Sequence, residues 1–205
     1  MTSTVAHPTR SNLARLAVIL MSGMILAACG INNIPTYQEN AKAKWSQVES
    51  QYKRRADLIP NLVETVKGFA AQEREVLTAV VEARAKASAT TINADQLTNA
   101  DAMKAFAENQ SALSGALSRL LVTVERYPEL KSSENFLTLQ SQLEGTENRI
   151  AVARRDYIEA VRLYNTELRT IPGRWWKALM YDESQPMASF SVSEEDLKNP
   201  EVKFN

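Results

Sequence analysis

The longest regular pattern of apolar and polar positions runs from Ser133 to Ile171. Along it, apolar or small residues recur at spacings that mostly alternate between three and four positions. This spacing places them on one side of an α-helix. These positions are Phe136, Leu139, Leu143, Thr146, Ile150, Ala153, Tyr157, Ala160, Tyr164, Leu168 and Ile171. Such a helix would be about 58 Å long, and because its apolar stripe is narrow it needs other helices to pack against.

A second helix is predicted from Ala102 to Tyr127. Its apolar positions alternate strictly between spacings of three and four, a period of 3.5 residues that is typical of coiled-coil packing. Gln110 is the one polar residue in this row, and we interpret it as a hydrogen-bonding residue that sets the register of the helices. The connection from 128 to 132 is short, so this helix and the longest one should be antiparallel neighbours.

The segment before these helices shows two further amphipathic patterns, with a proline between them. The first extends from Thr36 to about Ala56 and places Trp45 on the core side. Because proline disfavours helical geometry in the residue before it, we predict a turn over 57–60 and a separate helix from Pro60 to about 89. A kink at Pro60 within one continuous helix is the alternative. Residues 90–101 are typical of a loop, with Asp101 placed to cap the next helix.

These four patterns predict an all-α protein, an antiparallel up-and-down bundle of four long helices over residues 36–172. Only six glycines and seven prolines occur among 205 residues, a composition that also favours helices.

The first 29 residues are typical of a secreted lipoprotein. A basic start is followed by an apolar run from Leu16 to Leu26, which is shorter than a membrane span but long enough for a secretory signal. The next residues end in Cys29, and Leu-Ala-Ala-Cys resembles the bacterial lipobox. We therefore predict a lipoprotein signal peptide over 1–28, lipidation of Cys29 with palmitate-type acyl chains, and a tether over 29–35. An incidental cysteine after an uncleaved anchor helix is the alternative.

The C-terminal part, residues 173–205, is predicted to be a short tryptophan-containing segment and a flexible tail. Trp175 and Trp176 lie beside two cations, Arg174 and Lys177. The pair is compatible with a membrane interface or a partner's groove. A short helix that caps the open end of the bundle is an equal alternative.

The charges and the rare residues exclude several functional classes. Lys plus Arg and Asp plus Glu both number 24, so bulk charge does not favour nucleic-acid binding. The single cysteine is Cys29, and the single histidine, His7, lies in the predicted signal peptide. Histidine-dependent nucleophilic catalysis and histidine-containing di-iron sites are therefore excluded from the bundle. We expect no cofactor and no metal, while acid–base chemistry by two carboxylates remains possible.

Three runs of sequence resemble the LemA family of bacterial membrane-associated proteins. They are KRRADLIPNLVETVKG at 53–68, LSGAL at 113–117 and LEGTENRIAVARRDY at 143–157, and the resemblance extends from about Tyr37 to Gly173. It implies a four-helix up-and-down bundle that is anchored at its N-terminus and lies outside the cytoplasm. It implies no settled biochemical activity. The chain departs from the family in carrying a lipobox where members commonly have an uncleaved transmembrane helix, and in its tail after Gly173.

We therefore expect a non-enzymatic, lipid-anchored scaffold or adaptor of the bacterial envelope that has an envelope protein as its partner. The sequence does not determine the oligomeric state. Because Gly30 rather than aspartate follows Cys29, the location in a bacterium with two membranes would be the periplasmic side of the outer membrane. A carboxylate-dependent hydrolase or a bundle that binds a small ligand is the alternative. The candidate partner-facing residues are Arg54, Arg55, Glu147, Arg154, Arg155, Trp175 and Trp176. Contacts between helices that set their register are the competing interpretation of the charged residues.

Overall fold

The computed structural model describes residues 30–190, together with residues 15 and 18, and its described elements are all helical. The all-α prediction is therefore confirmed. The predicted signal peptide, apart from residues 15 and 18, and Cys29 lie outside the described residues. Four helices are long: α2 (Asn33–Phe69), α3 (Arg74–Ala89), α4 (Ala100–Val124) and α6 (Glu134–Glu167). Three are short: η1 (Ala94–Gln96), α5 (Pro128–Lys131) and α7 (Gly173–Met180).

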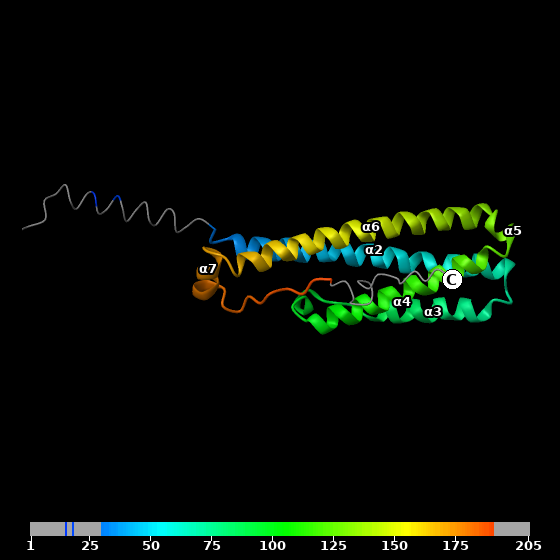
Figure 1. Cartoon of the computed structure of the whole chain (residues 1–205), viewed down its shortest axis with the longest axis horizontal. Helices are drawn as coiled ribbons and strands as arrows, with labels where there is room; N and C mark the ends of the chain where they lie inside the picture. The colour runs from blue at the N-terminus through cyan, green and yellow to red at the C-terminus, as the bar shows by residue number, and fades with distance from the viewer. Residues whose placement is uncertain (1–14, 16–17, 19–29, 191–205) are drawn as a thin grey trace, which may run out of the picture.

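The long helices form two pairs. Helices α2 and α6 lie side by side along most of their length, and α3 and α4 form a shorter hairpin (Figure 1). Helix α3 joins the pairs because it also packs on α2. The lengths are unequal, 37 and 34 residues in α2 and α6 against 16 and 25 in α3 and α4. The hairpin therefore covers only part of the longer pair.

The predicted turn over 57–60 is wrong, because α2 continues through Pro60 to Phe69. The alternative of one continuous helix is the correct one. Proline has no N–H, so the carbonyl of Ala56, four residues earlier, loses its partner within the helix. Arg84 of α3 replaces that partner, with its Nε donating to the Ala56 carbonyl oxygen over 2.7 Å. A neighbouring helix thus compensates for the break that the local sequence signals.

Other helix boundaries also differ from the prediction. Helix α2 begins at Asn33, so the predicted tether over 29–35 is helical in its last three residues. Asn99, and not Asp101, caps α4: its side chain accepts hydrogen bonds of 3.0 Å from the backbone N–H groups of Asp101 and Ala102. Asparagine in extended geometry is a favoured N-cap, because its short side chain reaches the first free N–H groups.

The buried apolar residues form two core clusters along the molecule. The first core cluster surrounds Trp45, whose ring packs edge-on against Phe106 and Tyr157. The second surrounds Leu120 and includes Leu117. The predicted core positions of α4 are buried, among them Phe106 and Leu113.

Residues 181–190 correct the prediction of a flexible tail after the tryptophan-containing segment. Met187 is buried in the first core cluster, and its backbone N–H and carbonyl both bond the side chain of Asn165 at 2.9 Å. The hydroxyl of Tyr157 donates to the carbonyl of Ala188 at 2.8 Å. This segment covers the part of α2 and α6 that the α3–α4 hairpin leaves open (Figure 1). The rest of the predicted tail, 191–205, lies outside the described residues.

Among the described residues, no helix combines the length and the hydropathy that a crossing of the bilayer requires.

Candidate functional site

Arg55 of α2 lies between the two core clusters and is the most buried charged residue that the structure describes, with 1% of its surface exposed. Burying a guanidinium without partners is expensive, so its surroundings must supply hydrogen bonds and a counter-charge. The structure provides both from two other helices, α4 and α6.

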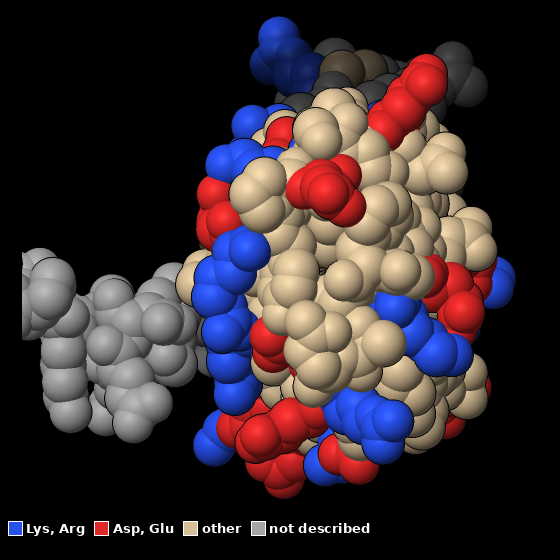
Figure 2. All heavy atoms as spheres, turned by 90° about the vertical axis from the view of Figure 1, so that its right-hand side faces the viewer, with Lys and Arg blue, Asp and Glu red and all other residues tan. Residues whose placement is uncertain are grey.

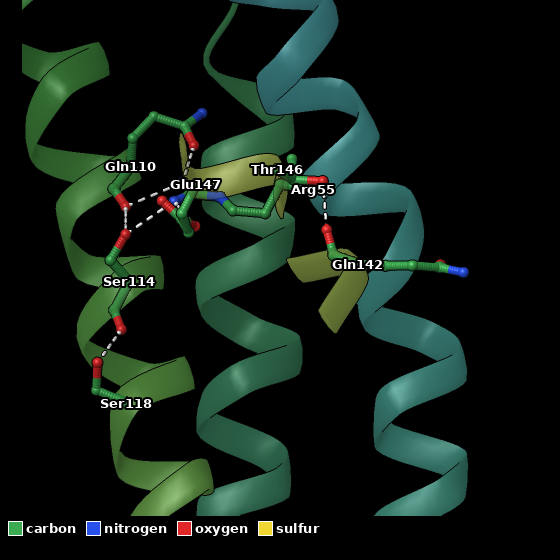
Figure 3. A network of polar contacts seen from close by, with 7 residues as sticks. All are labelled: Arg55, Gln110, Ser114, Ser118, Gln142, Thr146 and Glu147. Atoms are coloured by element: carbon green, nitrogen blue, oxygen red, sulfur yellow. Dashed lines mark hydrogen bonds and ion pairs between the residues drawn. The ribbon is translucent and has the colours of Figure 1, made fainter. Parts of the chain in front are cut away.

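The guanidinium of Arg55 makes four hydrogen bonds to other described residues (Figure 3). Its Nη1 donates to the Ser114 hydroxyl at 2.8 Å and to Oε1 of Glu147 at 2.9 Å. Its Nη2 donates to Oε1 of Gln110 at 2.6 Å and to the Gln110 carbonyl at 3.2 Å. The charge also lies 5.0 Å from the centre of the Tyr52 ring, close enough for a cation–π interaction.

We call Arg55, Gln110, Ser114 and Glu147 the polar layer. Gln110 extends it to α3, because its side-chain NH2 donates to the Ala87 carbonyl at 3.3 Å. Residues of α2, α3, α4 and α6 therefore meet at one level of the molecule. Hydrogen bonds can form only at matching heights along the helices, so the layer fixes their register. Gln110 thus makes the hydrogen bonds between helices that its interpretation as a register-setting residue requires.

The layer is buried on one side and open to solvent on the other. The Arg55 side chain is 1% exposed, whereas that of Glu147 is 46% exposed. Nε of Arg55 and Oε1 of Gln51, one turn earlier on α2, are buried without a hydrogen-bond partner among the described residues. Burial raises the pKa of the neighbouring Tyr52 above its ordinary value, although the charges of Arg154 and Arg55 oppose that rise.

The chemistry of this layer is that of an ion pair with neutral hydrogen-bond partners. A carboxylate-dependent hydrolase needs two carboxyl groups with pKa values driven apart. Within the described part of the chain, Glu147 is the only carboxylate bonded to the layer. The described residues also contain no group of three or more His, Cys, Asp or Glu placed to hold a metal ion.

The structure brings together only Arg55 and Glu147 among the predicted site residues. Arg54 and Arg155 are exposed, and Arg155 pairs with its neighbour Asp156 at 3.6 Å. Arg154 stacks over the ring of Phe190, 4.4 Å from its centre, and so helps to hold the 181–190 segment.

Trp175 and Trp176 diverge on α7. Trp176 packs against the first core cluster, which agrees with the capping interpretation, while Trp175 is exposed. Ser114 was not among the residues predicted for the site. A signal was available, because Ser114 follows Gln110 by four residues and so shares its side of the helix.

Each run of sequence that carried the family resemblance contributes to the polar layer. Arg55 belongs to the run at 53–68, Ser114 to that at 113–117 and Glu147 to that at 143–157. A family model described as "LemA family" matches residues 44–204. The chain belongs to the LemA family.

Curated relatives carry the name MamQ. Magnetosome proteins MamQ 2 and MamQ 1 of Paramagnetospirillum magneticum are each 28% identical over 166 residues, 73% of this chain and 60% of theirs. Magnetosome protein MamQ of Magnetospirillum gryphiswaldense is 25% identical over 181 residues, 80% of this chain and 66% of that protein. This LemA family chain thus spans about 60% of the length of the first two relatives.

Proposed function

We propose that this LemA family protein is a membrane-associated protein of the bacterial envelope that acts as a non-enzymatic scaffold or adaptor. In this proposal lipid on Cys29 holds the chain to the membrane, outside the cytoplasm, and on the periplasmic side of the outer membrane where the bacterium has two membranes. Helices α2, α3, α4 and α6 act as one up-and-down bundle that presents a surface to an envelope protein. Family membership and the lipobox-like sequence before Gly30 support the membrane association.

The observation that carries the scaffold proposal is a largely uncharged area at the end of the molecule remote from residue 30. Viewed end-on, this area has basic and acidic side chains around it and an acidic side chain within it (Figure 2). Large apolar side chains are exposed near this end of the helices: Phe69 at the end of α2, Val122 near the end of α4 and Leu137 near the start of α6. Exposed apolar groups inside a polar rim are typical of protein interaction sites.

The length of α2 separates this end from the proposed lipid. A helix of 37 residues is about 55 Å long, so an interaction surface at Phe69 would project well beyond the lipid headgroups. The polar layer supports the same role, because a fixed helix register keeps the remote surface in a constant shape. We call Phe69, Val122 and Leu137 the remote apolar face.

The proposal is tested by crosslinking in cells, followed by recovery of the protein from the envelope fraction. We expect the wild-type chain to capture a specific envelope protein, and Val122→Asp and Leu137→Asp each to lose it. Val152→Asp is the matched control, because Val152 is also an exposed apolar residue but lies in the middle of α6. Capture that is equal in all variants would contradict the remote apolar face, and no specific capture at all would contradict the scaffold role.

The lipid attachment has a separate test. Cys29→Ser is expected to abolish incorporation of labelled fatty acid and to release the protein from washed membranes, because serine offers no thiol for acylation. Continued incorporation of label by the serine variant would contradict lipidation at this position.

A further inference from the structure

The short helix α7 lies at the end of the molecule where α2 begins (Figure 1). Its position is closely defined. A side chain on Gly173 would collide with the Glu167 carbonyl oxygen, so the tight turn from α6 into α7 requires glycine. Asn33, at the start of α2, donates to Oε1 of Glu167 at 3.1 Å. A Cβ built on Gly30 would lie 3.3 Å from Cγ of Pro172, so the residue after Cys29 sits directly beside the start of α7.

Helix α7 and the residue before Pro172 expose large apolar side chains. Ile171 is 64% exposed, Trp175 58%, Leu179 75% and Met180 56%. Trp175 and Leu179 are four residues apart and so share one side of the helix. Trp176 instead turns to the first core cluster, so α7 has one side bound to the protein and another that no described residue covers.

Cations border this apolar side. Arg169, Arg174 and Lys177 line a groove of about 520 Å³ beside Leu168, and Asp182 is the one acidic residue among the described residues that line it. None of the three cations forms an ion pair within residues 30–190. Three positive charges against one negative charge leave the groove basic and suited to phosphate groups.

We propose that α7 is a membrane-interface helix that lies in the surface of an anionic phospholipid bilayer. Trp175 and Leu179 enter the boundary between headgroups and acyl chains, and Arg169, Arg174 and Lys177 contact lipid phosphates. Tryptophan is favoured at the boundary between headgroups and acyl chains. Amphipathic helices bind at this boundary through the apolar area that they bury and through electrostatic attraction to anionic lipids. The inference rests on the proposed N-terminal attachment, because Gly30 beside Pro172 brings lipid on Cys29 next to α7.

A bilayer fits this surface better than a second protein because of the geometry at residue 30. Only residues 30–32 separate Cys29 from the first turn of α2. Three residues span at most about 11 Å, so the proposed lipid holds the exposed side of α7 within reach of the membrane. The consequence is a second point of contact, which stops the protein from rotating freely about its lipid and sets the direction of α2.

The test uses the tryptophan fluorescence of the full-length protein, purified from membranes and reconstituted into vesicles of zwitterionic and anionic phospholipid with brominated acyl chains. Bromine quenches only tryptophans that approach the acyl chains. We expect strong quenching in the wild type and loss of most of it in Trp175→Phe, because Trp45 is buried and Trp176 packs against protein. Leu179→Asp should weaken quenching, whereas Val152→Asp, an exposed site on α6, should leave it unchanged.

Flotation of the same vesicles separates failure of this inference from failure of the attachment. Protein that floats with the vesicles but shows no quenching, or equal quenching in Trp175→Phe, would overturn the role of α7 and leave the lipid attachment standing. Protein that does not float would overturn both. Quenching that is equally strong without anionic lipid would overturn the role of the three cations.

Discussion

At the scale of single residues, Arg55 shows how a buried charge can organise a helical protein. The guanidinium has fixed planar geometry and is always charged, so it favours only arrangements in which several acceptors converge on it. Gln110 and Ser114 supply neutral acceptors, and Glu147 supplies the opposite charge. Because Arg55 is buried and Glu147 is half exposed, the two members of the pair should respond differently to substitution.

Glu147→Ala is expected to lower the free energy of unfolding by about 2 kcal/mol, because it leaves a buried cation without a counter-charge. The double variant Arg55→Met/Glu147→Ala should cost less than the sum of the two single changes, since it removes the charge that needed compensation. Chemical denaturation of the four proteins measures this coupling. The control is Glu144→Ala, an exposed glutamate one turn away on α6, which should change stability by less than about 0.5 kcal/mol. Additive costs would contradict the coupling.

At the scale of secondary-structure elements, α2 shows that a neighbouring helix can overrule a local signal. Pro60 predicts a helix end, since it removes one hydrogen bond and crowds the preceding turn. Helix α2 nevertheless continues, with Ile59 and Leu62 buried on either side of the proline. Burial of Ile59 and Leu62 in the second core cluster favours the continuous helix. Arg84 bonds the Ala56 carbonyl, which proline leaves without a partner in the helix.

Arg84→Leu is therefore expected to destabilise the protein by about 1 to 2 kcal/mol, because the Ala56 carbonyl loses its partner. In a Pro60→Ala background the same change should cost clearly less, since the new N–H at residue 60 can bond that carbonyl. Thermal unfolding of the single and double variants measures the difference. Lys86→Leu, an exposed cation on the same helix, serves as the control. An equal cost of Arg84→Leu in both backgrounds would show that the bond to Ala56 does not compensate for the proline.

At the scale of the whole molecule, two core clusters are joined by helices that pass through both. Helices α2 and α6 contribute residues to each cluster, with Trp45 and Ile59 on α2 as examples. The polar layer lies between the two clusters. Its hydrogen bonds join α3 and α4 to α2 and α6 at one level of the molecule. Disruption of one cluster should therefore spread to the other through the shared helices.

Leu117→Asp tests this cooperativity. The change buries an unpaired charge in the second core cluster and should cost about 3 kcal/mol or more. Circular dichroism should report a lower thermal midpoint, and the fluorescence of Trp45 in the first core cluster should fall at the same temperature. Val122→Asp is the control on the same helix, because that side chain is exposed. An unchanged midpoint would contradict burial of Leu117, and separate transitions would contradict cooperative unfolding.

The sequence alone determined the helical class, the apolar sides of α4 and α6 and the family, because helical periodicity and continuous motifs are local properties of a chain. It also identified Arg55, Gln110 and Glu147, but not their convergence, since the register of separate helices depends on packing between them. Three features were decided by the tertiary structure. Contacts distant in sequence carry α2 through Pro60, hold residues 181–190 on Asn165 and Tyr157, and place α7 beside Gly30. Each depends on a partner 20 or more residues away in the chain, which no local pattern records.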